Sequence, residues 1–190
     1  MDNDVSAGST TSTLGHLALG LTLLAYGVGG TGVIDNVAAS DAAVLATWVG
    51  GVALFVAGLF ELHAGNGRTG TAFAGLGAFW FAWGTGSGAG VSAEAGGLFM
   101  VLWAMLSLSL TAAASGSGLM TRGVYGLLTL SLLLSGIGAF ADASALGRIG
   151  GWAAALAGLG AWYGATASLA KWPTLAGRAA GRGPGVTATG

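Results

Sequence analysis

Charged residues divide this chain into long uncharged runs, and their spacing limits the possible folds more than any other feature. Runs without Asp, Glu, Lys or Arg extend over 5–34, 42–60, 69–93, 95–121, 123–141 and 149–170. A helix needs about 20 mainly apolar residues to cross the roughly 30 Å hydrocarbon core of a bilayer. The spacing therefore predicts an all-α, polytopic membrane protein with six transmembrane helices and short loops.

The composition agrees with a lipid environment. Six Lys and Arg and seven Asp and Glu make only 7% of the 190 residues, whereas an ordinary soluble domain carries roughly 25%. Hydrophobic residues make up 54%, and the mean hydropathy is +0.77. A net charge of −1 offers no basic surface for a polyanion, so nucleic-acid binding is not expected.

The basic residues favour one orientation in the membrane. The N-terminus, alternate loops and C-terminal segment share one side, which holds Arg68, Arg122, Lys171, Arg178 and Arg182. The loops of the other side contain Arg148 as their only basic residue. Because Lys and Arg concentrate in cytoplasmic loops, both termini are predicted to be cytoplasmic in a multi-pass protein of the cell membrane.

Three segments follow from this reading. Residues 1–13 form a polar N-terminal segment without the basic start of a cleavable signal, so the first apolar segment is expected to remain. Residues 14–171 form the six-helix transmembrane domain, which ends at an interfacial Lys-Trp-Pro sequence. Residues 172–190 are rich in glycine and basic, which predicts a flexible tail.

Few ionisable residues lie near the expected spans. Glu61 is either a proton-linked or gating group or an interfacial anchor paired with Arg68, and His16 is either a pH sensor or a solvated interfacial residue. No Lys or Arg lies well inside a run. A carboxylate crossing the middle would therefore stay partly hydrated, contact hydroxyl and backbone dipoles, or cross with a proton.

No catalytic pattern is present. The chain has no cysteine, two histidines, and no H-E-x-x-H, G-x-S-x-G or phosphate-binding loop. We therefore expect neither an enzyme nor a bound cofactor or metal.

Glycine is unusually frequent, with 38 residues. Spacings of four residues, as in Gly147 with Gly151 and Gly160 with Gly164, let transmembrane helices approach closely. These glycines either serve packing alone or also thin the helices around a narrow pore.

A motif over residues 58–84 resembles the acetate uptake transporter family, also called the succinate-acetate permeases. The matching positions are Gly58, Phe60, Glu61, Gly65, Asn66, Thr71, Ala72, Phe73, Gly77, Phe79 and Trp80. The family's N-P-A-P-L-G-L opening is reduced here to Leu14 and Gly15, followed by His16.

The resemblance implies a homo-hexamer in which every protomer has its own pathway and apolar constriction. The constriction positions fall on Leu19, Leu76 and Leu128, where the family has an aromatic residue, a tyrosine and a leucine. The implied pathway or gating residues are Leu14, Gly15, His16, Glu61, Asn66, Thr71, Phe79 and Trp80.

The leading hypothesis is a transporter or channel for acetate or a similar small monocarboxylate, with succinate as a further candidate, either proton-coupled or passive. One alternative is a channel for a small neutral solute such as urea or ammonia, which the lack of buried cations would suit. Another is a membrane sensor or scaffold that does not transport, which the altered N-terminal motif would suit.

Overall fold

Helices form along every uncharged run in the computed structural model, which describes residues 10–87, 89–116 and 118–172. They are α1 (Thr10–Thr31), α2 (Ala39–Ala46), the π-helix η1 (Thr47–Ala53), α3 (Leu54–His63), α4 (Gly67–Ser87), α5 (Ala93–Ala113), the 3-10 helix η2 (Ala114–Gly116), α6 (Leu119–Phe140) and α7 (Ser144–Leu169). The all-α prediction is confirmed. Helix α1 begins inside the predicted polar segment 1–13, and the predicted tail lies outside the described residues except for Trp172.

Three helical segments of the described chain are long and apolar enough to cross a membrane: Thr11–Thr31, Ala93–Gly116 and Leu119–Phe140. Elements α2, η1 and α3 follow one another without a break and form one rod. Helices α4 and α7 are also long, with 21 and 26 residues, but their many glycines contribute little apolar surface.

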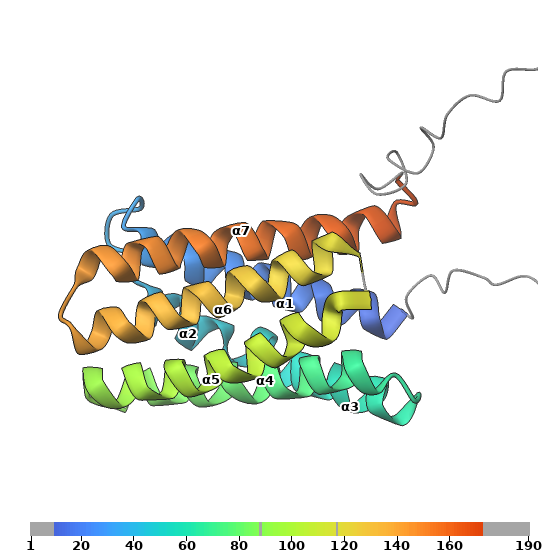
Figure 1. Ribbon diagram of the computed structural model, residues 1–190, viewed down its shortest axis with the longest axis horizontal. Helices are drawn as coiled ribbons and strands as arrows, with labels where there is room; N and C mark the ends of the chain where they lie inside the picture. The colour runs from blue at the N-terminus through green and yellow to red at the C-terminus, as the bar shows by residue number, and fades with distance from the viewer. Residues whose placement is uncertain (1–9, 88, 117, 173–190) are drawn as a thin grey trace, which may run out of the picture.

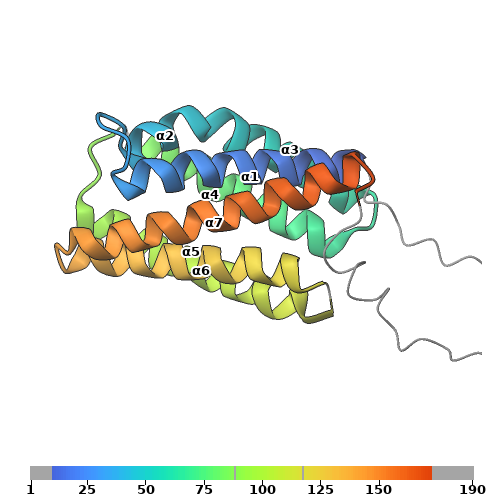
Figure 2. The same cartoon turned by 90° about the horizontal axis from the view of Figure 1, so that it is seen from above.

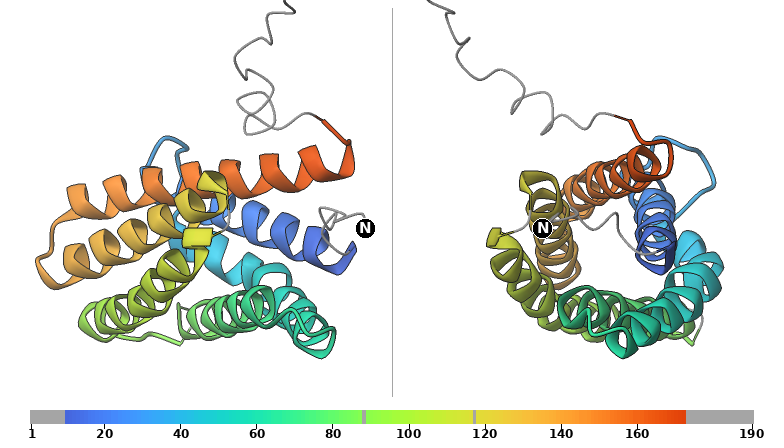
Figure 3. Two further views of the ribbon diagram at one scale, coloured as in Figure 1. Left: turned by 45° about the vertical axis from the view of Figure 1, so that its right-hand side comes forward. Right: turned by 90° about the vertical axis from the view of Figure 1, so that its right-hand side faces the viewer.

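The rods form a closed ring around a shared core (Figure 3). Helix α7 packs between α1 and α6, α5 packs on α6 and contacts α4, and the α2–η1–α3 rod packs on both α4 and α1. Helix α1 begins and α7 ends at one end of the bundle, where the α3–α4 turn also lies (Figures 1 and 2). We call this the terminal end and the opposite one the far end.

Glycines allow α1 and α7 to touch along their backbones. A Cβ added at Gly20 would lie 2.7 Å from the backbone nitrogen of Trp162, and one at Gly27 would overlap the backbone of Ala155. On α7, a Cβ at Gly158 would lie 2.6 Å from the backbone nitrogen of Leu24. Close packing of this kind is how small residues hold helices together where surrounding lipid is as apolar as the helix surface.

Candidate functional site

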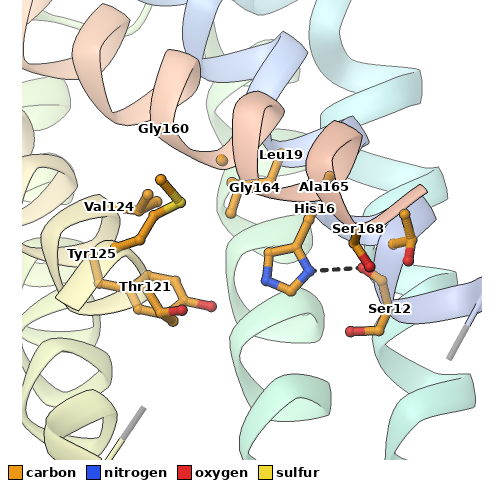
Figure 4. A pocket seen from close by; sticks show the side chains of 13 residues that line it. Ser12, His16, Leu19, Thr121, Val124, Tyr125, Gly160, Gly164, Ala165 and Ser168 are labelled. Atoms are coloured by element: carbon orange, nitrogen blue, oxygen red, sulfur yellow. Dashed lines mark hydrogen bonds between the residues drawn. The ribbon is translucent and has the colours of Figure 1, made fainter. Parts of the chain in front are cut away.

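A vestibule opens at the terminal end between α1, α6 and α7, with a volume of about 280 Å³ (Figure 4). We call it the terminal vestibule. Its lining residues are Ser12, Thr13, His16, Leu19, Met120, Thr121, Val124, Tyr125, Gly160, Ala161, Gly164, Ala165 and Ser168. Glycine at positions 160 and 164 leaves room there, because a Cβ at either position would press on Val124 or Met120.

His16 is the one histidine among the residues that line this vestibule. Its Nδ1 lies 2.8 Å from the Ser12 carbonyl oxygen, and since a carbonyl only accepts, Nδ1 carries the donated hydrogen. The ring packs edge-on against Phe73, with centroids 4.9 Å apart. Figure 4 shows the imidazole on α1 facing Thr121 and Tyr125 of α6 across the vestibule. Packing and the Nδ1 bond thus fix the ring's orientation.

A second vestibule of about 440 Å³ lies at the far end, and we call it the far vestibule. Its lining residues are Tyr26, Gly29, Gly30, Gly32, Val37, Ala38, Ala39, Trp83, Met100, Ser135, Ser144, Gly147, Arg148 and Gly151. An adjoining pocket of about 320 Å³ between α4, α5 and α6 shares Trp83, Met100 and Ser135 with it. The two vestibules therefore lie at opposite ends of the bundle, and α1, α6 and α7 contribute to both.

An apolar layer separates the vestibules. On α1, Leu19 lines the terminal vestibule and Tyr26 the far one, and the fully buried Leu23 lies between them. Seven residues of helix correspond to about 10 Å. On α6, Leu128 and Leu132 lie between Tyr125 and Ser135 and are each 1% exposed. The stretch between the vestibules thus covers about two helical turns and is mainly apolar, with Thr22 and Ser131 as buried polar residues within it.

The predicted constriction residues are all buried in the core of the bundle. Leu19, Leu76 and Leu128 are 0 to 1% exposed and share one core cluster. Phe79 and Trp80 belong to the same cluster and pack edge-on, with ring centroids 5.0 Å apart. The structure thus brings the three leucines into one core, although no contact among them defines a pore diameter.

The remaining predicted positions divide between core and surface. Gly15 of α1 lies so close to the Phe73 ring that a Cβ there would overlap it. Leu14 is 59% exposed and Thr71 is exposed, and neither lines a vestibule.

Glu61 and Asn66 form a polar contact at the α3–α4 turn. The Glu61 side chain is 1% exposed, and its Oε2 accepts a 2.7 Å hydrogen bond from Asn66 Nδ2. The Asn66 backbone nitrogen also donates to the Glu61 carbonyl oxygen at 2.9 Å. Between them Gly65 has φ +83°, a left-handed conformation that ends helices and suits glycine. This pair therefore fixes the turn that carries the family-like motif.

Sequence reasoning did not find several vestibule residues. They are Thr121 and Tyr125 of the terminal vestibule and Tyr26, Ser135 and Arg148 of the far one, and they lie on three different helices. Their proximity depends on how the helices pair, which no local spacing shows. Within the described residues, no group of three or more His, Cys, Asp or Glu could hold a metal ion.

Comparison with known proteins agrees with this architecture. The profile of the GPR1/FUN34/yaaH family matches residues 5–174. The fold is similar to the structure of the bacterial acetate channel SatP, with a TM-score of 0.74 and 24% sequence identity over 86% of this chain and 93% of that one. No curated protein sequence matches at a significant level. These findings confirm the resemblance drawn from residues 58–84.

Proposed function

Because the chain belongs to the GPR1/FUN34/yaaH family, we propose that it is a membrane transporter or channel for acetate or a similar small monocarboxylate, with succinate as a further candidate. The observation that carries this proposal is the apolar layer between two vestibules at opposite ends of the bundle. A solved relative with this fold is an acetate channel. We assign the constriction to Leu19, Leu76 and Leu128.

The chemistry of the layer favours a small, weakly hydrated acid. Hydrated ions would lose their water among leucine side chains without replacement ligands, which is costly. Acetic acid is small, and protonation removes the charge that makes desolvation expensive. A carboxylate that crosses with a proton, or partly hydrated, therefore suits this layer better than a bare ion.

The pathway residues have distinct proposed roles. His16 contacts the substrate in the terminal vestibule, while Phe79 and Trp80 support the constriction from α4. Glu61 and Asn66 act by holding the α3–α4 turn rather than by lining the route. Leu14, Gly15 and Thr71 are proposed as pathway or gating residues on the resemblance alone. The absence of a side chain at Gly15 leaves room for the Phe73 ring.

Labelled acetate uptake into vesicles that contain the purified protein tests this function. Uptake above empty vesicles, inhibited by unlabelled propionate or succinate and dependent on pH, would support carboxylate transport. Flux of labelled urea or ammonia that is independent of pH and unaffected by carboxylates would instead support the neutral-solute channel. No flux of any of these solutes would overturn transport and favour the sensor or scaffold.

We also propose that six rods span the cell membrane, the α2–η1–α3 rod counting as one, with both termini cytoplasmic. The alternation of loops between the two ends of the bundle supports this topology (Figure 1). The chain has no cysteine, so Arg122→Cys and Arg148→Cys each introduce one unique thiol. An impermeant thiol reagent added outside intact cells should label Arg148→Cys and not Arg122→Cys. The reverse result would invert the orientation.

A homo-hexamer is proposed on the resemblance alone. A closed ring of helices within one protomer is compatible with a separate pathway in each copy. The mass of the detergent-solubilised complex, corrected for bound detergent, tests this prediction. A monomeric mass that still supports acetate flux would contradict it.

A further inference from the structure

Arg148 lies within α7 rather than in the loop before it, because α7 begins at Ser144. Its side chain lines the far vestibule, and its Nε lies 3.7 Å from the position of a Cβ added at Gly32. Among the residues that line the two vestibules, Arg148 is the single Lys or Arg, and no Asp or Glu is present. Arg148 has no ion-pair partner in the described part of the chain.

Other hydrogen-bond donors surround the same space. Trp83 lines the far vestibule and the adjoining pocket, and its buried indole Nε1 has no hydrogen-bond partner in the described chain. Tyr26 and Ser135 also line this vestibule, and each carries a hydroxyl group. Such N–H and O–H groups are the partners that carboxylate oxygens use in proteins.

The start of α7 adds to this positive environment. Ser144 and Gly147 lie in its first turns and line the vestibule with Arg148. The partial positive charge at a helix N-terminus favours anions, and here it lies beside a guanidinium and an unpaired indole N–H. A cation, a helix dipole and an indole N–H without a partner in the described chain thus meet at one cavity.

We propose that the far vestibule is a binding site for the carboxylate anion and that Arg148 is its principal charged ligand. The far vestibule binds a small carboxylate in its ionised form. The carboxylate then reaches the apolar layer, where a charge is disfavoured. This inference rests on the proposed function and deepens it by naming a substrate-binding residue.

The acidic loop residues at the far end do not cancel this attraction. Asp35, Asp41, Glu94 and Asp142 are exposed and do not line the vestibule. Asp41 Oδ2 also accepts a hydrogen bond from the Ala38 backbone nitrogen. Exposed charges, Arg148 included, are screened beyond about 8 Å at physiological ionic strength, so the charge that lines the cavity has the strongest effect on an anion inside it. The vestibule therefore concentrates anions through Arg148, although the loops around it are acidic.

The first test measures the acetate concentration that gives half-maximal uptake. Arg148→Gln should raise it about fivefold, the order expected for one partly exposed charge-assisted contact, while Arg148→Lys should stay within about twofold. Arg122→Gln is the matched control, since it removes the same charge from an exposed position outside both vestibules and should change nothing. At high salt, the difference in half-maximal acetate concentration between Arg148→Gln and the wild-type protein should become smaller, because the Arg148 charge is screened.

The second test measures binding without transport. Ser144→Cys places a unique thiol in the far vestibule and leaves Arg148 intact. Acetate should slow its labelling by a thiol reagent, and neutral acetamide should not. Adding Arg148→Gln to Ser144→Cys should abolish this protection, whereas adding Arg122→Gln should preserve it.

The outcomes separate the two proposals. If the wild-type protein transports acetate but Arg148→Gln and Arg122→Gln behave alike in both tests, the inference is overturned and the proposed function stands. If the wild-type protein transports no acetate, the proposed function fails. In that case, acetate protection of Ser144→Cys that is lost with Arg148→Gln would still support an anion-binding site in the far vestibule. If acetate gives no such protection, the anion site is overturned as well.

Discussion

The side-chain amide of Asn66 donates a 2.7 Å hydrogen bond to Glu61 Oε2, which joins the end of α3 to the start of α4 around a left-handed Gly65. The Glu61 side chain is almost completely buried. A buried acceptor that loses its donor retains its desolvation penalty, whereas an exposed one regains water. Glu61 and Asn66, two positions of the motif over residues 58–84, thus have a structural role in holding the α3–α4 turn.

Asn66→Ala should lower the stability of the protein by about 1–3 kcal/mol, because it removes a hydrogen bond to a buried carboxyl group. The measurement is thermal unfolding of the purified protein in detergent. Thr71→Ala, an exposed change on the nearby helix α4, is the control and should leave the unfolding temperature unchanged. Equal unfolding temperatures for Asn66→Ala and Thr71→Ala would contradict this role.

Gly27→Ala should destabilise the bundle by about 1–3 kcal/mol, since the new methyl group would force α1 away from the backbone of Ala155. Gly123→Ala on α6 is the matched control, because no atom lies within 4 Å of a Cβ at that position. This control should be neutral or stabilise the helix by about 0.5–1 kcal/mol. The measurement compares the thermal unfolding temperatures of both variants in the same detergent. A higher unfolding temperature for Gly27→Ala than for the wild-type protein would contradict close packing of α1 on α7.

Gly164→Leu should reduce acetate flux at least several-fold while the protein still folds. The leucine side chain would extend into the terminal vestibule, whose volume is only about 280 Å³. Gly123→Leu adds the same side chain at an exposed position and should keep wild-type flux. The variants are compared by initial uptake rate per mole of correctly folded protein. Normal flux through Gly164→Leu would remove the terminal vestibule from the route.

Charge spacing predicted the helical elements well because a charge seldom lies in an apolar span. Arg122 and Asp142, for example, lie close to the ends of α6, Leu119–Phe140. The same rule misplaced the role of Arg148, since it assigns every charge to a loop, whereas α7 begins four residues earlier. That residue was interpreted as a loop charge, and its place in the far vestibule could not be predicted.

Other features depend on pairing between helices. The π-helical turn over Thr47–Ala53 follows no pattern in the single sequence. The four-residue glycine spacing pointed to Gly147 and Gly151, but only Gly151 packs against α1, and a Cβ at Gly147 would meet open space. The close contacts of Gly20 and Gly27 are seven residues apart and appear only once α7 lies beside α1.

The central claim is that acetate passes through the apolar layer inside one protomer, and Leu76→Trp tests it most directly. Leu76 is 1% exposed in the core of the bundle, while Leu108 on α5 is 58% exposed and provides the control Leu108→Trp. Labelled acetate uptake should be abolished by Leu76→Trp and unchanged by Leu108→Trp, with both proteins folded and inserted equally. Uptake through Leu76→Trp at the wild-type rate would contradict a pathway through this layer.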